Sequence, residues 1–136
     1  MTNAALAESV GLTATPMLQR IRKLEQRGVI SGYTAVVDAK AVGRGTTAFV
    51  LVKQAEHRLA SHKRVLQAVA AIPEVIECHH IAGEDDFLLK VVVRDIAEYE
   101  RFMLDRLAQI PGIDRVKTVF VLSTAKAGAP LPIDEP

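Results

Sequence analysis

The same junction occurs twice in this sequence, and this repeat constrains the fold more than any other feature. Ile72-Pro73-Glu74-Val75 and Ile110-Pro111-Gly112-Ile113 each follow a helical pattern and lead into a β-branched segment. Proline ends a helix because it lacks an N–H and clashes with the preceding turn. Each junction therefore predicts a helix that is followed almost at once by a strand.

The segments around these junctions predict the element order β-α-β-β-α-β. The expected strands are 46–53, 75–82, 87–93 and 113–123, and the expected helices are 59–72 and 96–110. Apolar side chains at helical spacing define the expected inner stripes, which are Leu59, Val65, Leu66, Val69 and Ile72 in the first helix and Ile96, Tyr99, Met103, Leu107 and Ile110 in the second. The order predicts an α+β, ferredoxin-like domain with an antiparallel four-stranded sheet and two helices on one face. Strand 87–93 is apolar on both faces, so we expect the uncovered face to form a homodimer, sheet against sheet.

The first third of the chain has a different charge and a different pattern. Residues 1–45 carry six basic and three acidic side chains, whereas the remainder carries eleven and thirteen. A basic head on a mildly acidic body indicates that the head meets a polyanion. We expect a head over residues 1–40, a linker at 41–45 and the ferredoxin-like domain over 46–136.

Two helices and a short strand are expected in the head. Residues 4–9 favour a helix, and Thr13 is suited to cap a second helix that ends near Arg27 before Gly28. Residues 33–37 have the pattern of a strand. Two helices joined by a glycine-containing turn are typical of a helix-turn-helix, whose second helix enters the DNA major groove.

The second helix is amphipathic, with Met17, Leu18, Ile21 and Leu24 on one side. Its outer side carries groups that bind phosphates and base edges. The candidate DNA-binding residues are Thr13, Thr15, Gln19, Arg20, Arg22 and Lys23. On this segment alone, an ordinary solvated basic face is an equal alternative.

The turn Gly83-Glu84-Asp85-Asp86 is the second candidate site. Its three carboxylates suit a cation or the ammonium group of a small ligand, and backbone N–H groups nearby suit a carboxylate. An ordinary acidic hairpin turn explains the same residues.

Several functional classes lack support in the sequence. No apolar run reaches the roughly 18 residues of a membrane-spanning helix, and one cysteine, Cys78, cannot form an internal disulfide. We expect a cytoplasmic protein that does not enter a membrane.

Phosphate-binding, dinucleotide-binding and nucleophile-elbow motifs are missing, so we expect no enzyme, no catalytic residues and no cofactor. Neighbours on a strand point to opposite faces, so Cys78, His79 and His80 predict no metal site.

Residues 6–33 closely resemble the helix-turn-helix of the Lrp/AsnC, or feast/famine, transcriptional regulators. Residues 77–90 and 107–113 resemble the effector-binding domain of the same family, so the resemblance covers nearly the whole chain. It implies a DNA-binding regulator that forms a homodimer, often a tetramer or octamer, and binds an amino acid or related metabolite between subunits. The family's Gly-x-x-Asp turn matches Gly83 and Asp86, while Glu84 and Asp85 occupy its variable positions, the second of which is often aromatic.

The resemblance also implies a further helix ahead of residues 4–9, which this sequence does not contain. The alternatives are a truncated sequence, a start assigned at an internal Met, or a member with a partial head. A second function, a small-molecule-sensing oligomerisation module with little DNA binding of its own, fits a partial head. Isothermal titration with amino acids, beside a DNA titration, separates the two functions.

Overall fold

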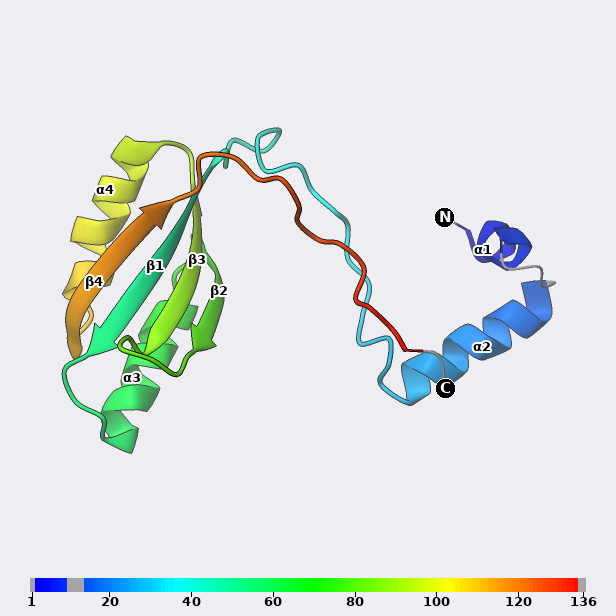
Figure 1. The fold of residues 1–136 in the computed structure, drawn as a ribbon, viewed down its shortest axis with the longest axis horizontal. Coiled ribbons are helices and arrows are strands. Elements are labelled where there is room, and N and C mark those ends of the chain that lie inside the picture. The colour runs from blue at the N-terminus through cyan, green and yellow to red at the C-terminus, as the bar shows by residue number, and fades with distance from the viewer. Residues whose placement is uncertain (1, 10–13, 135–136) are drawn as a thin grey trace. The chain divides into compact units, whose positions relative to one another are not determined.

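The computed structural model describes residues 2–9 and 14–134, which form two compact units, Met1–Val36 and Val37–Pro136. The first unit holds two helices, α1 (Asn3–Ser9) and α2 (Ala14–Gln26) (Figure 1). The Thr2 hydroxyl accepts a hydrogen bond from the Ala5 N–H at 3.1 Å and caps the start of α1. Among the described residues, no helix is long and apolar enough to span a membrane.

A glycine-dependent cap ends α2 where the sequence predicts it. The Val29 N–H donates to the Leu24 carbonyl at 2.9 Å, and the Gly28 N–H donates to the Glu25 carbonyl at 3.0 Å. These two bonds form a Schellman motif, with Gly28 at a φ of +77°. The predicted cap at Thr13 lies outside the described residues.

The strand predicted at residues 33–37 does not form. This segment has no regular structure, and Val36 is fully exposed. A strand needs a hydrogen-bonded neighbour. All strands of the described residues pair within one sheet of the second unit, so the β-branched side chains here have no strand to join.

The second unit contains an antiparallel sheet in the order β2-β3-β1-β4. Its strands are β1 (Thr46–Gln54), β2 (Val75–His80), β3 (Phe87–Val93) and β4 (Ile113–Phe120). The helices α3 (Leu59–Ala70) and α4 (Ile96–Asp105) cover one face (Figure 1). The βαββαβ order and its ferredoxin-like arrangement are confirmed, with the apolar strand β3 in a central position.

Alternate residues of the central strands face the helices and build the core. Val50 and Leu89 are fully buried and belong to one cluster with Val65 and Val69 of α3 and Phe102 of α4. No helix of the described part of the second unit covers the opposite face. It presents side chains that we call the open face, and they are Thr47, Phe49, Leu51, Leu88, Lys90, Val92, Lys117 and Val119.

Three details of the helices and strands differ from the prediction. Leu59 and Ile96 are 68% and 65% exposed, because side chains in a first turn tilt back toward the helix start and away from the sheet. The helix predicted to reach residue 110 ends at Asp105, and the 3₁₀ turn η1 (Leu107–Gln109) follows, which still buries Leu107 and Ile110. β2 and β4 end earlier than predicted, although the Val121 N–H still bonds the Thr47 carbonyl.

Candidate functional site

The outer side of α2 has the composition of a DNA-contacting surface. Thr15, Gln19, Arg20, Arg22 and Lys23 are all exposed. Met17 is buried, and Leu18 and Ile21 are half-buried, so the two sides of the helix differ as its apolar period predicts. Leu24, also predicted on the inner side, is 39% exposed.

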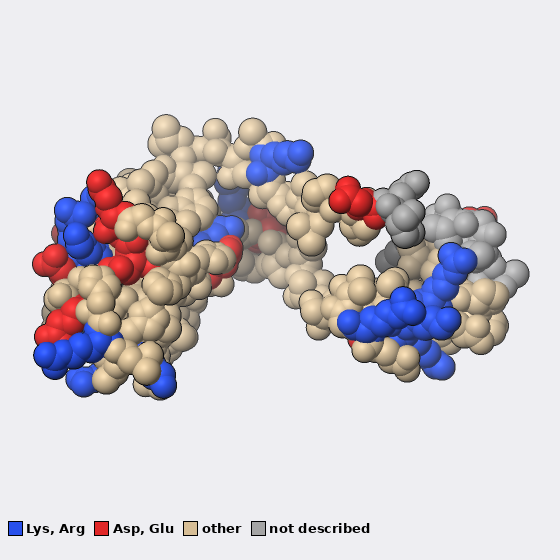
Figure 2. Space-filling view, turned by 60° about the horizontal axis from the view of Figure 1, so that its bottom comes forward, with Lys and Arg blue, Asp and Glu red and all other residues tan. Residues whose placement is uncertain are grey.

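The cationic groups of this surface are uncommitted. Within residues 2–9 and 14–134, no ion pair engages Arg20, Arg22 or Lys23, whereas the basic side chains Arg44, Arg94 and Arg106 of the second unit pair with carboxylates. Figure 2 shows Lys and Arg side chains gathered on the unit that contains α2. Unpaired guanidinium groups on an exposed helix are available to phosphates and to guanine edges.

Glu25, the acidic residue in the last turn of α2, binds Tyr33 and not a basic residue of the helix. The Tyr33 hydroxyl donates to Glu25 Oε1 at 2.8 Å. This hydrogen bond raises the pKa of the Tyr33 hydroxyl. The carboxylate of Glu25 is therefore held by the segment after the helix, and no ion pair joins it to the basic residues of α2 among the described residues.

The turn 83–86 holds its two aspartates in different ways. Asp86 Oδ2 accepts the Gln54 N–H at 2.8 Å, and Asp86 Oδ1 lies 3.0 Å from His57 Nε2. The Gln54 hydrogen bond, with His57 beside it, lowers the pKa of the Asp86 carboxyl. Asp86 thus ties the turn to the segment between β1 and α3.

Asp85 is buried, with a side chain that is 7% exposed. Its Oδ2 lies 3.5 Å from Lys117 Nζ, and its Oδ1 lies 3.7 Å from Arg115 Nη2. Oδ1 has no hydrogen-bond partner among the described residues. Glu84, by contrast, is 86% exposed and lies 4.0 Å from Lys117 Nζ, while Gly83 is exposed. The turn therefore holds the Asp85 carboxylate buried beside two basic side chains and exposes the Glu84 carboxylate to solvent.

Sequence reasoning placed the candidate residues on a helix face and on a turn. The described members of the first set share one side of α2, the second set forms one turn, and Thr13 lies outside the described residues. Sequence reasoning missed the partners of the turn: Gln54, His57, Arg115 and Lys117 lie about 30 residues away in the chain, and their spacing carries no signal. His62 is half-buried, with its ring 5.2 Å from that of Phe87 and 4.7 Å from that of His80. Among the described residues, no group of three potential ligands is arranged to hold a metal ion.

A helix-turn-helix segment joined to a ferredoxin-like domain is typical of two-domain transcription regulators. In this class, one domain binds DNA and the other binds a ligand. Residues 1–31 match the family described as winged helix-turn-helix DNA-binding, and residues 47–131 match the Lrp/AsnC ligand binding domain. The chain belongs to the Lrp/AsnC family of transcriptional regulators.

Individual relatives resemble the chain over most of its length. The DNA-binding transcriptional activator DecR of Escherichia coli K12 is 37% identical over 130 residues, which cover 96% of this chain and 86% of DecR. An AsnC family transcriptional regulator from Agrobacterium tumefaciens has a TM-score of 0.89 at 38% identity. The match covers 97% of this chain and 86% of the chain of that regulator. A regulator from Neisseria meningitidis, solved as a complex with L-Met, has a TM-score of 0.91 at 31% identity. That match covers 97% of this chain and 85% of the Neisseria chain.

Proposed function

We propose that this chain is a sequence-specific DNA-binding transcription regulator that reads DNA with the outer face of α2 and responds to an amino acid. The observation that carries the proposal is the exposed set of Thr15, Gln19, Arg20, Arg22 and Lys23, whose three basic members form no ion pair within the described residues. Together with Thr13, which lies outside the described residues, these are the proposed DNA contacts.

The chemistry of these side chains assigns them different tasks. Arg20, Arg22 and Lys23 neutralise phosphates, and an arginine can also bind the guanine edge with two hydrogen bonds. Gln19 has the amide geometry that pairs with adenine, and Thr15 has a hydroxyl for a phosphate oxygen. Helix side chains of this kind enter the major groove and combine affinity with sequence discrimination.

The effector in this proposal is a free amino acid or a related metabolite, bound at Gly83, Glu84, Asp85 and Asp86 between subunits. Relatives from Neisseria meningitidis and Mycobacterium tuberculosis have been solved with L-methionine, which supports the ligand class. The exposed carboxylate of Glu84 supports the place, because an ammonium group donates to such an oxygen. The effector acts by favouring one assembly over another.

Assembly in this proposal begins with a homodimer through the open face and extends to tetramers or octamers. A dimer carries two heads and suits a roughly palindromic site with half-sites in successive major grooves. The proposal also places the protein in the cytoplasm, alongside the DNA that it binds, and gives it no enzymatic activity.

The DNA-binding face is tested with a duplex enriched from a random-sequence pool by the wild-type protein. We expect the logarithm of affinity to fall with the logarithm of salt concentration, with a slope of about 0.9 per neutralised phosphate. The double variant Arg20→Ala/Arg22→Ala should bind more weakly and show a shallower slope in gel-shift titrations at several salt concentrations.

A matched variant separates a local effect from a change in total charge. Lys63→Ala/Arg101→Ala removes the same two charges from exposed positions of α3 and α4, where neither side chain forms an ion pair with a described residue, and should retain the wild-type slope. Equal binding by wild type and Arg20→Ala/Arg22→Ala would refute the proposed face. Amino-acid binding without any DNA binding at low salt would identify a sensing module instead.

A further inference from the structure

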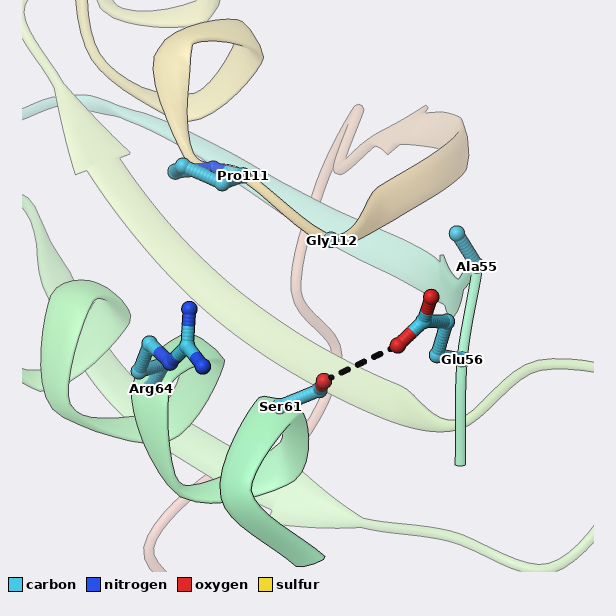
Figure 3. Close-up of a pocket in the computed structure, with 6 residues that line it drawn as sticks. All are labelled: Ala55, Glu56, Ser61, Arg64, Pro111 and Gly112. Atoms are coloured by element: carbon cyan, nitrogen blue, oxygen red, sulfur yellow. Dashed lines mark hydrogen bonds between the residues drawn. The ribbon is translucent and has the colours of Figure 1, made fainter. Parts of the chain in front are cut away.

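The second unit contains a cavity that none of the predicted site residues touches. It measures about 290 Å³ and lies between the segment after β1, the first turns of α3 and the turn that leads into β4. Figure 3 shows its lining, which consists of Ala55, Glu56, Ser61, Arg64, Pro111 and Gly112.

Opposite charges face each other across this cavity. The Arg64 guanidinium and the Glu56 carboxylate enter it from opposite sides (Figure 3). Arg64 forms no ion pair within the described part of the chain. Glu56 Oε2 accepts the Ser61 hydroxyl at 3.3 Å and lies 3.9 Å from Arg58 Nε. The cavity therefore offers an uncommitted guanidinium at one end and an anchored carboxylate at the other.

Backbone contacts fix the walls that carry these groups. The Ala55 N–H donates to the Gly112 carbonyl at 2.8 Å, which joins the segment before Glu56 to the turn before β4. Gly112 has a φ of +95°, and a Cβ there would lie 3.3 Å from Val65 Cγ2. Glycine at this position lets the turn pass directly over α3, so the separation between the two walls is set by the fold.

We propose that this cavity binds a free α-amino acid through the two charged groups of the ligand. Arg64 binds the α-carboxylate with two parallel hydrogen bonds, and Glu56 binds the α-ammonium group with help from the Ser61 hydroxyl. A zwitterion satisfies both groups at once, whereas a simple anion would leave Glu56 facing an added negative charge.

This site is additional to the effector site proposed above, because it lies within one subunit and uses none of residues 83–86. The two sites are still neighbours in the chain. Gln54, whose N–H bonds Asp86, directly precedes Ala55. Substitutions of Glu56 or Arg64 therefore test the cavity while leaving the turn and its own hydrogen bonds intact.

The test is isothermal titration of the full chain with each of the twenty L-amino acids, followed by titration of the best ligand as its α-amide and as its N-acetyl derivative. Arg64→Gln removes the charged hydrogen bonds of Arg64 and should weaken binding of the amino acid roughly 10- to 100-fold. The α-amide should bind wild type weakly and lose nothing further in Arg64→Gln. Glu56→Gln should show the same insensitivity toward the N-acetyl derivative.

Two control variants make the outcome specific. Arg101→Gln removes an exposed charge of α4 and should bind as wild type does. Lys63→Gln removes an exposed charge of α3 that does not line the cavity and should also bind as wild type does. Unchanged amino-acid binding in both Arg64→Gln and Glu56→Gln would overturn the cavity site and leave the regulator proposal standing. Equal binding of amino acid and N-acetyl derivative by wild type would reduce the cavity to an anion site, and an absence of amino-acid binding would also overturn it. The salt-dependent DNA titration judges the regulator proposal separately.

Discussion

At the scale of single residues, Asp86 makes the connections on which the sensor domain's turn depends. One carboxylate oxygen satisfies the N–H of the buried Gln54, and the other meets His57. A buried N–H without an acceptor costs about as much as the hydrogen bond itself. Asp86 therefore stabilises the fold as well as belonging to the proposed effector turn.

Asp86→Ala should lower the free energy of unfolding by roughly 1.5–3 kcal/mol at neutral pH, because it removes a charged acceptor. The lowered pKa of Asp86 sets the pH dependence. Its contribution is complete above the unfolded-state pKa near 3.9 and is lost as the pH falls through the lower native pKa. In urea titrations followed by circular dichroism, the difference between wild type and variant should shrink below about pH 4. Asp114 is exposed and forms no ion pair or side-chain hydrogen bond within the described residues, so Asp114→Ala should show no such difference.

The limits of sequence reasoning are visible at the same scale. The outer residues of α2 could be predicted because helical periodicity alone decides which side of a helix they share. Asp86 with His57, Asp85 with Lys117, and Arg64 across from Glu56 could not be predicted. These pairs join different elements, and only the packed fold brings them together.

At the scale of elements, the C-terminal cap of α2 determines where the recognition helix ends. Gly28→Ala places a Cβ at a φ of +77° and should cost about 1–2 kcal/mol. We expect α2 to unfold at a lower temperature, measured as an earlier loss of helical signal in circular dichroism, and we expect weaker DNA binding. Gly32→Ala is the matched control, because it lies in the same segment, has no positive φ and has open space around it. Equal effects of the two substitutions would show that the cap contributes nothing.

Element prediction succeeded where a local pattern had a tertiary partner. Strand β3 was predicted with its observed bounds, since this apolar run between a turn and a helix finds hydrogen-bonded neighbours, β2 and β1, along both of its edges. Residues 33–37 have a similar β-branched composition but no adjacent strand. Strand propensity reflects packing on a sheet surface, so it does not produce a strand in isolation.

At the scale of the whole molecule, the open face determines how many heads act together in the proposed assembly. Phe49, Leu51 and Leu88 lie beside one another across the central strands, and Val119 is 56% exposed next to Phe49. An apolar patch of this kind on a sheet is typical of a subunit interface. Val119→Asp should therefore weaken the dimer at least tenfold in sedimentation equilibrium, because it buries an unpaired charge. Leu104→Asp, on α4 and also 56% exposed, should leave the dimer intact.

The same pair of variants connects assembly to DNA recognition. Affinity depends on salt through the number of phosphates neutralised, about 0.9 per phosphate, and a dimer places two α2 helices on one duplex. Val119→Asp keeps Arg20, Arg22 and Lys23 in place but separates the heads. At protein concentrations where it is monomeric, its salt slope in gel-shift titrations should fall to about half of the wild-type value. An unchanged slope in a demonstrably monomeric Val119→Asp would mean that one head makes all the phosphate contacts, and the two-head arrangement would then be wrong. A halved slope in Leu104→Asp would instead attribute the effect to the added acid.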